Sequence, residues 1–306
     1  MKVVTSGYRY LDIDAYGGII AYAELLNLLG EPAIAASTAP LNESITPTIH
    51  SWQAELTRGY QQAPDDEFVL IDISEPEFFD TFVDRSKVAE ILDHHPEFIE
   101  YWAERPATKA QIEFIGAACT LVYEQWVKTG KLEQISSTSA RLLIAGILDN
   151  TLNFRAGVTT DRDRAAYAGL MEHANLPADW PAQYFGECQE QALADLKTVI
   201  RGDIKVTTYQ SFGRKTAVGQ LVVWNAKEMV ATRLSEIEDS MAGQADDWFM
   251  SLISLVEGRN YFITTVPAVQ QFLERFLNVR FVGSVAVADR LWLRKEIMKK
   301  DMEHKR

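Results

Sequence analysis

Short apolar runs alternate with helical patterns through the first half of the chain. Residues 2–6, 68–73 and 88–92 have the length and composition of strands, and the last two are apolar enough to be covered on both faces. Thr160 and Asp163 form a carboxylate variant of the capping box at the start of the last helical segment. Because parallel strands need a long crossover, usually a helix, this order predicts a parallel α/β sheet with right-handed crossovers. The segments with helical spacing are residues 19–29, 120–127, 139–148 and 161–174.

The second half has a different pattern, in which strands follow one another more closely. Pro177, Pro181 and the polar stretch 187–191 indicate a break before it. The chain has 306 residues, against ~150 for a typical domain. We therefore expect a parallel-sheet α/β domain over residues 1–185 and a smaller mixed α/β domain over residues 186–306. In the latter, the strand-like segments are residues 217–224, 249–256, 261–266 and 280–288, and the helical ones are residues 227–241 and 269–277.

The composition excludes two classes of partner. The chain has 43 acidic and 30 basic residues, which gives a net charge of −13. A nucleic-acid surface or attraction to an anionic membrane requires a basic surface, so we expect neither. Two cysteines are too few for a disulfide framework or a four-thiolate zinc site. No signal peptide and no run of ~18 apolar residues is present, so we expect a cytoplasmic protein.

Carboxylates and histidines cluster where the predicted strands end. The carboxyl ends of parallel strands meet at one edge of the sheet, which is where α/β proteins bind ligands. A carboxylate inside an apolar strand must be paired or bind a cation, since a lone buried charge is costly. Asp12 and Asp14 follow the first run, Asp72 lies inside the second, Asp93-His94-His95 end the third, and Asp149 ends a later apolar segment.

Each cluster also has a purely structural interpretation. Asp12 and Asp14 suit a turn or a helix N-cap, Asp72 suits a hydrogen-bonded strand end, and the paired histidines suit a helix cap. Their occurrence on successive strand ends favours a metal site. Carboxylate and imidazole ligands suit Mn²⁺, Mg²⁺ or Fe²⁺. A bridging carboxylate such as Asp72 would hold two ions ~3.5–4 Å apart, the arrangement that activates water against phosphorus.

The same segments resemble a known superfamily. Asp93-His94-His95 is the signature of the DHH phosphoesterases, and the motif order resembles their branch of manganese-dependent (family II) inorganic pyrophosphatases and exopolyphosphatases. In the second half, residues 203–205, 218–222 and 293–295 resemble the same branch more loosely. The segments of the first half that carry the resemblance are residues 7–14, 68–73, 116–122, 147–154 and 159–163.

The resemblance implies a set of ligands and partners. It implies Mn²⁺, or Mg²⁺ or Co²⁺, as one or two ions, together with a small phosphorylated or polyphosphate substrate and a homodimer. It also implies that Lys205 and Arg294 reach across a cleft between the domains to bind substrate phosphate, although both equally suit ordinary surface positions. The metal ligands would be Asp12, Asp14, Asp72, His94 and Asp149.

Three positions depart from the family pattern. Tyr8 stands where the pyrophosphatases have a histidine ligand and the exopolyphosphatases have asparagine. Asn150 stands at the aspartate of the fourth motif, with Asp149 one residue earlier, and Leu293 replaces the serine of the last motif. Either Asp149 takes over as a ligand or this metal position is weakened.

We therefore expect a metal-dependent phosphohydrolase that cleaves phosphoanhydride bonds of pyrophosphate or short polyphosphate between its domains. Asp14 or Asp72 would orient or deprotonate the attacking water. His95, Lys205 and Arg294 would neutralise charge on the phosphoryl group. The alternatives are a phosphodiesterase on small nucleotides and a protein that binds a phosphorylated ligand with weak or no turnover.

Overall fold

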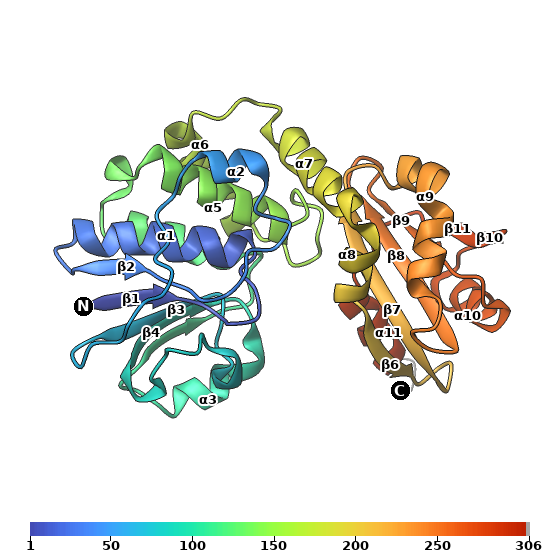
Figure 1. Cartoon of the computed structure of the whole chain (residues 1–306), viewed down its shortest axis with the longest axis horizontal. Helices are drawn as coiled ribbons and strands as arrows, with labels where there is room; N and C mark the ends of the chain where they lie inside the picture. Colours follow the sequence, from blue (N-terminus) through green and yellow to red (C-terminus); the bar gives the residue numbers. More distant parts are fainter. Residues whose placement is uncertain (304–306) are drawn as a thin grey trace. The chain divides into compact units, whose positions relative to one another are not determined.

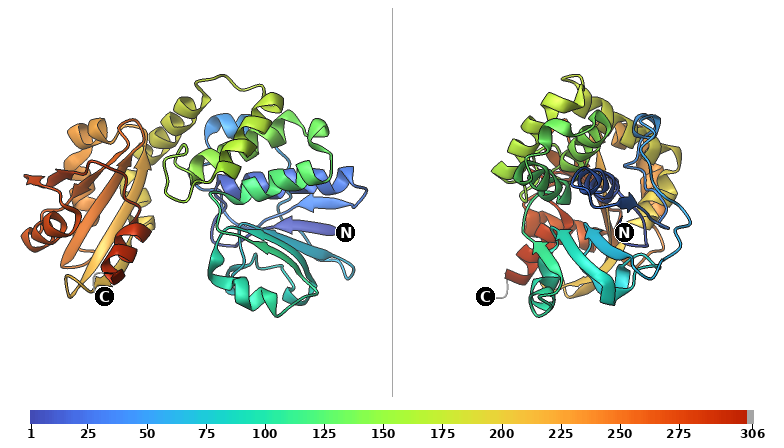
Figure 2. Two further views of the ribbon diagram at one scale, coloured as in Figure 1. Left: turned by 180° about the vertical axis from the view of Figure 1, so that it is seen from behind. Right: turned by 90° about the vertical axis from the view of Figure 1, so that its left-hand side faces the viewer.

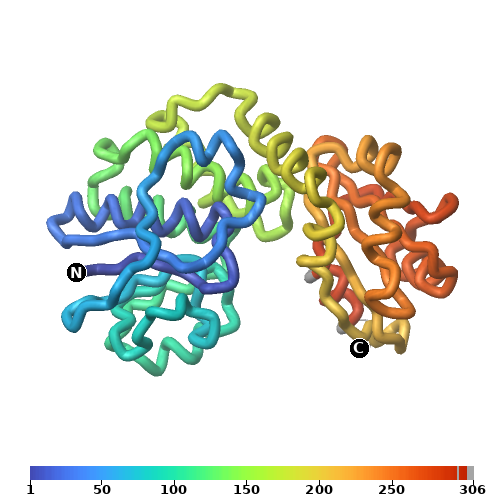
Figure 3. Tube along the Cα trace, viewed as in Figure 1, coloured from blue at the N-terminus to red at the C-terminus, as the bar shows by residue number. Residues whose placement is uncertain are grey.

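The structure, a computed structural model, describes residues 1–303 and separates the chain into two units, Met1–Tyr184 and Phe185–Arg306. Each unit has its own sheet and its own helices (Figure 1), and Figure 3 traces the course of the chain through both units. Within residues 1–303, no helix is both long enough and apolar enough to cross a membrane.

The sheet of the first unit is fully parallel, as the alternating pattern predicts. Its strands run in the order β2-β1-β3-β4-β5, and each neighbouring pair is parallel. The central strand β3 is buried from Phe68 to Ile71 because helices or loops cover both of its faces. The two edge strands left no clear sequence signal, since β2 has three residues and β5 carries Lys109 and Gln111. The strands are β1 Lys2–Thr5, β2 Ala33–Ala35, β3 Glu67–Ile71, β4 Val88–Asp93 and β5 Lys109–Ile112.

Helix α1 packs closely against α4 and α5 on one face of this sheet, while α3 lies on the other face (Figures 1 and 2). Two glycines allow this approach: a Cβ on Gly17 would lie 2.8 Å from the carbonyl oxygen of Leu142, and one on Gly18 would lie 2.5 Å from Ile71 Cγ2. The helices are α1 Ile13–Leu28, α2 Pro47–Ser51, α3 Ile99–Ala103, α4 Ala118–Lys128, α5 Ser137–Asn150 and α6 Asp161–Ala174. Short 3₁₀ turns are η1 Pro76–Phe78, η2 Arg85–Lys87, η3 Pro96–Phe98 and η4 Leu132–Gln134.

A helix, and not a loop, occupies the predicted break near residues 177–191. Helix α7 (Trp180–Ala194) runs through this segment, and the boundary between the units falls inside it. Pro181 is compatible with a helix because it lies in the first turn, where its missing N–H has no intrahelical partner to lose. The polar stretch consists largely of glutamate and glutamine, which favour helices as readily as they favour loops.

The second unit has a mixed sheet, as predicted. Its strands run in the order β10-β11-β9-β8-β7-β6, with β7 and β8 parallel and the other neighbours antiparallel. Residues 280–288 do not form the single predicted strand, because a turn at Gly283, with φ of 64°, divides them into β10 and β11. The strands are β6 Lys205–Tyr209, β7 Arg214–Val223, β8 Asp247–Ser254, β9 Arg259–Ile263, β10 Phe281–Val282 and β11 Val285–Val287.

Both faces of the second sheet carry a hydrophobic core. Val218, Phe249 and Phe272 belong to the core on one face. Their neighbours Ala217 and Met250 belong to the core on the other face, because successive side chains of a strand point to opposite sides. The helices of this unit after α7 are α8 Leu196–Gly202, α9 Ala226–Met241, α10 Pro267–Leu277 and α11 Arg294–Glu303.

Candidate metal centre

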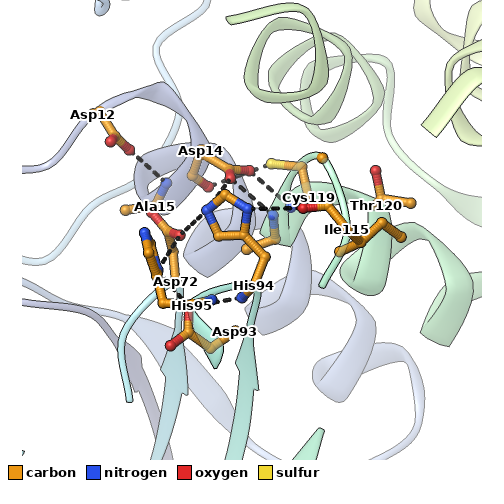
Figure 4. Close-up of polar contacts among 12 residues, drawn as sticks. Asp12, Asp14, Ala15, Asp72, Asp93, His94, His95, Ile115, Cys119 and Thr120 are labelled. Atoms are coloured by element: carbon orange, nitrogen blue, oxygen red, sulfur yellow. Dashed lines mark hydrogen bonds and ion pairs between the residues drawn. The ribbon is translucent and has the colours of Figure 1, made fainter. Parts of the chain in front are cut away.

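The predicted acidic and histidine residues of the first unit meet at the carboxyl edge of its sheet (Figure 4). Strands β1, β3 and β4 are consecutive and parallel, so the segments that follow them leave the sheet at the same edge. Asp12 and Asp14 follow β1, Asp72 follows β3, and His94 and His95 follow β4.

Asp72 lies directly after β3 and not inside the strand, which corrects the sequence-based expectation. Its φ of 61° is in the left-handed region, where aspartate is tolerated better than most side chains. The backbone N–H of Asp72 still donates to the carbonyl oxygen of Leu92 on β4 at 2.9 Å. The backbone therefore turns away from the sheet at Asp72 itself. Its Oδ1 atom is buried and accepts no hydrogen bond from any described residue. A buried oxygen of this kind is available to a cation.

His94 presents one ring nitrogen to this oxygen. Its Nδ1 lies 3.2 Å from the carbonyl oxygen of Ile115, which can only accept, so Nδ1 carries the hydrogen and Nε2 is available as a ligand. Nε2 lies 3.2 Å from Asp72 Oδ1 and 3.9 Å from Asp14 Oδ2. Although burial disfavours a charged ring, the carboxylates of Asp72 and Asp14 raise the pKa of His94 to about 10. The surrounding negative charge therefore favours a cation at this point.

Asp14 is fixed by the start of helix α4. Its Oδ2 accepts from the N–H of Ala118 at 2.8 Å, and its Oδ1 accepts from the N–H of Cys119 at 2.7 Å. Burial and the charge of Asp72 raise the pKa of Asp14 to about 7, in spite of these donors and of His94. The sequence pattern did not reveal the two backbone donors; the small residues 116–119 are the signal that could have indicated them.

Asp12 combines the structural and the functional interpretations. It is the N-cap of α1, and its Oδ1 accepts from the N–H of Ala15 at 3.0 Å, which confirms the N-cap alternative. Burial and the charges of Asp72 and Asp14 nevertheless raise the pKa of Asp12 to about 8. Its other oxygen is left for a further ligand, because a carboxylate has acceptor capacity beyond one hydrogen bond.

Asp93 orients His95. Its Oδ1 accepts from Nδ1 of His95 at 2.8 Å and from the N–H groups of His94 and His95 at 2.7 and 3.2 Å. Burial opposes ionisation of Asp93, but the hydrogen bond from His95 lowers its pKa. Although partial desolvation opposes charge on the ring of His95, Asp93 and Asp72 raise its pKa. The side chain of His95 is 57% exposed.

Asp149 adds to the acidic cluster from the last turn of α5. Its charge contributes to the raised pKa of Asp12. The hydroxyl of Tyr184 donates to Asp149 Oδ1 at 2.8 Å, a contact that sequence reasoning missed. Burial raises the pKa of Asp149 to about 6, against the effect of this hydrogen bond.

Tyr8, which stands where the pyrophosphatases have a histidine ligand, is 39% exposed, and its ring lies 6.2 Å from that of Phe78.

Lys205 and Arg294 both lie in the second unit. Arg294 binds Asp203 in a bidentate ion pair, with Nη1 2.8 Å from Oδ2 and Nη2 3.1 Å from Oδ1. Nη1 also lies 3.2 Å from the carbonyl oxygen of Val218, the residue that pairs with Lys205 across β6 and β7. Lys205 is exposed. The loosely matching segments 203–205, 218–222 and 293–295 thus meet in one place.

The residues of the first unit fit a divalent metal ion. Asp72, His94 and His95 each offer a ligand atom, and these atoms lie within 4.8 Å of one another. Asp12 and Asp14, whose pKa values are raised in part by the charge of Asp72, add negative charge near the buried Oδ1 of Asp72. Oxygen and imidazole ligands of this kind suit Mn²⁺ or Mg²⁺.

No family model matches the chain. The manganese-dependent inorganic pyrophosphatase of Methanothrix thermoacetophila is 24% identical over 285 residues, which cover 90% of this chain and 89% of that protein. A protein of Listeria welshimeri serovar 6b described as a "probable manganese-dependent inorganic pyrophosphatase" is 24% identical over 293 residues, which cover 93% of this chain and 92% of that protein.

The chain is a distant full-length homologue of the family II pyrophosphatases. This confirms the resemblance to the DHH superfamily. A crystal structure assigned to a family II inorganic pyrophosphatase of Methanococcus jannaschii matches with a TM-score of 0.66 at 19% identity and covers 99% of both chains. An exopolyphosphatase-related protein of Bacteroides fragilis matches with a TM-score of 0.51 at 12% identity over 99% of this chain and 90% of that one. The family II fold therefore extends over both units.

Proposed function

We propose that the chain is a metal-dependent phosphohydrolase that cleaves a phosphoanhydride bond of pyrophosphate or a short polyphosphate. The observation that carries the proposal is the buried Oδ1 of Asp72, 3.2 Å from Nε2 of His94 and within reach of His95. The full-length relatives are named for manganese-dependent hydrolysis of pyrophosphate, which supports the same chemistry.

The residues that would hold Mn²⁺ are the carboxylates and the histidine at the carboxyl edge of the first sheet. A divalent ion bound there would lower the pKa of a water molecule and place positive charge beside the phosphoryl oxygens. Asp14 would keep its position during the reaction because both of its oxygens are held by backbone donors. The metal ligands would be Asp12, Asp14, Asp72, His94 and Asp149.

His95 is proposed to contact the phosphoryl group. Asp93 holds Nδ1 of His95, so the proton on Nε2 of the charged ring can be donated to a phosphate oxygen. The exposure of the ring allows this contact. Lys205 and Arg294 of the second unit are proposed to bind phosphate oxygens, the task for which guanidinium and ammonium groups are suited.

Phosphate release with Mn²⁺ tests the proposal. Pyrophosphate, tripolyphosphate and a dinucleotide phosphodiester are assayed with the wild type, with Asp72→Asn and with the exposed-site control Asp65→Asn. Asparagine keeps the size of Asp72 and also tolerates a positive φ, so the fold should survive. We expect Asp72→Asn to lower the rate of phosphoanhydride hydrolysis at least about 100-fold. Replacing a residue that only orients a metal ligand already costs about 10–100-fold in metal affinity or activity.

Two results contradict the proposal. Metal-dependent release from the diester alone indicates a phosphodiesterase. Tight binding of pyrophosphate with Mn²⁺ in calorimetry, without any release, indicates a ligand-binding protein.

A further inference from the structure

A cavity of about 220 Å³ lies beside the metal centre, within the first unit. Its volume is large against the ~10–15 Å³ that admits one water, so it has room for a group beyond the atoms held at the metal ligands. Its walls include Asp12, Asp72 and His95 of the centre and Arg9, Tyr10 and Phe78 of the adjoining loops.

Arg9 supplies positive charge to this cavity. Its Cζ atom lies 3.9 Å from the centroid of the Phe78 ring, a cation–π contact that restrains the guanidinium without using its N–H groups. Among the described residues, Arg9 makes no ion pair and no hydrogen bond through its side chain. Its five donors therefore remain available.

The lack of an ion pair is informative because carboxylates line the same cavity. Asp12 and Asp72 share the walls with Arg9, yet neither binds it. Both carboxylates are assigned to metal ions in the proposed function, so Arg9 is left to face a separate anion. Guanidinium groups bind phosphate oxygens in a bidentate manner, which makes a phosphate the best-matched ligand.

We propose that Arg9 binds a further phosphate of a substrate that has at least three, beyond the two that flank the bond to be cleaved. This proposal rests on the proposed function, because it extends the substrate from the metal centre along the cavity. It makes Arg9 a specificity-determining residue that favours short polyphosphate over pyrophosphate.

Equilibrium binding tests the proposal without depending on turnover. Imidodiphosphate and diimidotriphosphate, which resist hydrolysis and contain two and three phosphorus atoms, are titrated into the Mn²⁺-loaded wild type and Arg9→Gln. We divide the affinity for diimidotriphosphate by the affinity for imidodiphosphate. We expect this ratio to fall about tenfold in Arg9→Gln, as for the loss of one charge-assisted contact. Arg9→Lys should fall in between, because lysine keeps the charge but not the fork.

The matched control is Arg85→Gln, which removes the same charge from an exposed arginine of η2. It should leave the affinity ratio at the wild-type value. An equal loss for both ligands in Arg9→Gln, no change for either, or no binding of diimidotriphosphate to the wild type overturns the proposal. Failure to hydrolyse either phosphoanhydride counts against the proposed function alone, since the titrations still report on Arg9.

Discussion

The hydroxyl of Tyr184 donates a 2.8 Å hydrogen bond to Oδ1 of Asp149. Tyr184 is completely buried and comes from α7, whereas Asp149 lies in the last turn of α5. The bond holds in place the carboxylate that neighbours the departure from the family motif at Asn150. Asp149 is thereby oriented by a residue 35 positions later in the chain.

Tyr184→Phe should weaken Mn²⁺ binding more at pH 6 than at pH 8. The hydrogen bond lowers the pKa of Asp149, which burial raises to about 6, so its loss raises that pKa further. Protons then compete with the metal near pH 6 but not at pH 8. Calorimetric Mn²⁺ titrations at both pH values measure the effect. In thermal unfolding, the lost bond should cost about 1 kcal/mol.

The control for this variant is Tyr167→Phe. The ring of Tyr167 packs on Phe154, and its hydroxyl makes no hydrogen bond with a described residue. It should leave Mn²⁺ binding unchanged at both pH values. An equal Mn²⁺ affinity for Tyr184→Phe and the wild type at pH 6 would argue that Asp149 is not a ligand.

Gly146→Ala should disturb the metal centre through packing. A Cβ at this position would lie 2.6 Å from Cys119 Sγ, closer than real contacts allow, and 3.0 Å from Asp14 Cα, which is tighter than most real contacts. We expect a loss of about 1–3 kcal/mol in the free energy of unfolding, typical of overpacking, together with weaker Mn²⁺ binding. Urea unfolding and calorimetry measure the two effects. Gly186→Ala is the control, because its Cβ would meet open space.

Asp163→Ala should destabilise the start of α4 and, through it, Asp14. The buried Asp163 carboxylate accepts from the N–H groups of Gly116 and Thr160 and from both threonine hydroxyls, Thr120 and Thr160. Removing it leaves several buried donors unpaired, at a cost of about 3 kcal/mol. Chemical denaturation measures this cost. The exposed, same-turn variant Asp161→Ala should change it by less than about 0.5 kcal/mol.

Without metal, the protein should become less stable as pH rises from 5 to 8. The pKa values of Asp12 and Asp14 are raised to about 8 and about 7 by burial and by neighbouring carboxylates, so the folded state retains protons that the unfolded state releases near 3.8. The unfolded state then binds fewer protons, and the free energy of unfolding falls with pH. His94 acts in the same direction, because its stabilisation is lost from pH 6.5 towards its raised pKa of about 10.

Thermal unfolding of chelator-treated protein checks this pH dependence. Asp12→Asn should flatten the slope, since one of the titrating groups is removed. Added Mn²⁺ should raise the melting temperature most at pH 8, where the carboxylates are ionised. A melting temperature that rises between pH 5 and 8 without metal would refute the proton assignment.

Periodicity predicted the parts of the fold that are long and apolar. The parallel arrangement of β1, β3 and β4 could be predicted because apolar strand-like runs alternate with helical patterns in this half of the chain. The capping box at Thr160 and Asp163 was also predictable, and both of its hydrogen bonds are formed. The edge strands β2 and β5 were not, because they are short and partly polar and depend on pairing with a neighbour for their conformation.

The residues that we propose as metal ligands were predicted to lie near one another because each follows the end of a strand or an apolar segment, and Asp12, Asp14, Asp72 and His94 do lie together. The contacts that orient them were not predicted, since they join distant segments: Tyr184 to Asp149, and the carbonyl of Ile115 to His94. The left-handed conformation of Asp72 was hidden for another reason. Ile73 continues the apolar run after it, so the alternation of polarity does not mark the end of the strand.

The backbone donors of Asp14 come from residues 104 and 105 positions further along the chain. Closing a loop of that length costs entropy that only long-range contacts recover, so we expect this junction to form late during folding. A chain that emerges from the ribosome with α1 but without α4 has the aspartates in place but not the helix end that aims them. Tight retention of a cation would therefore mark the moment at which the first unit has finished folding.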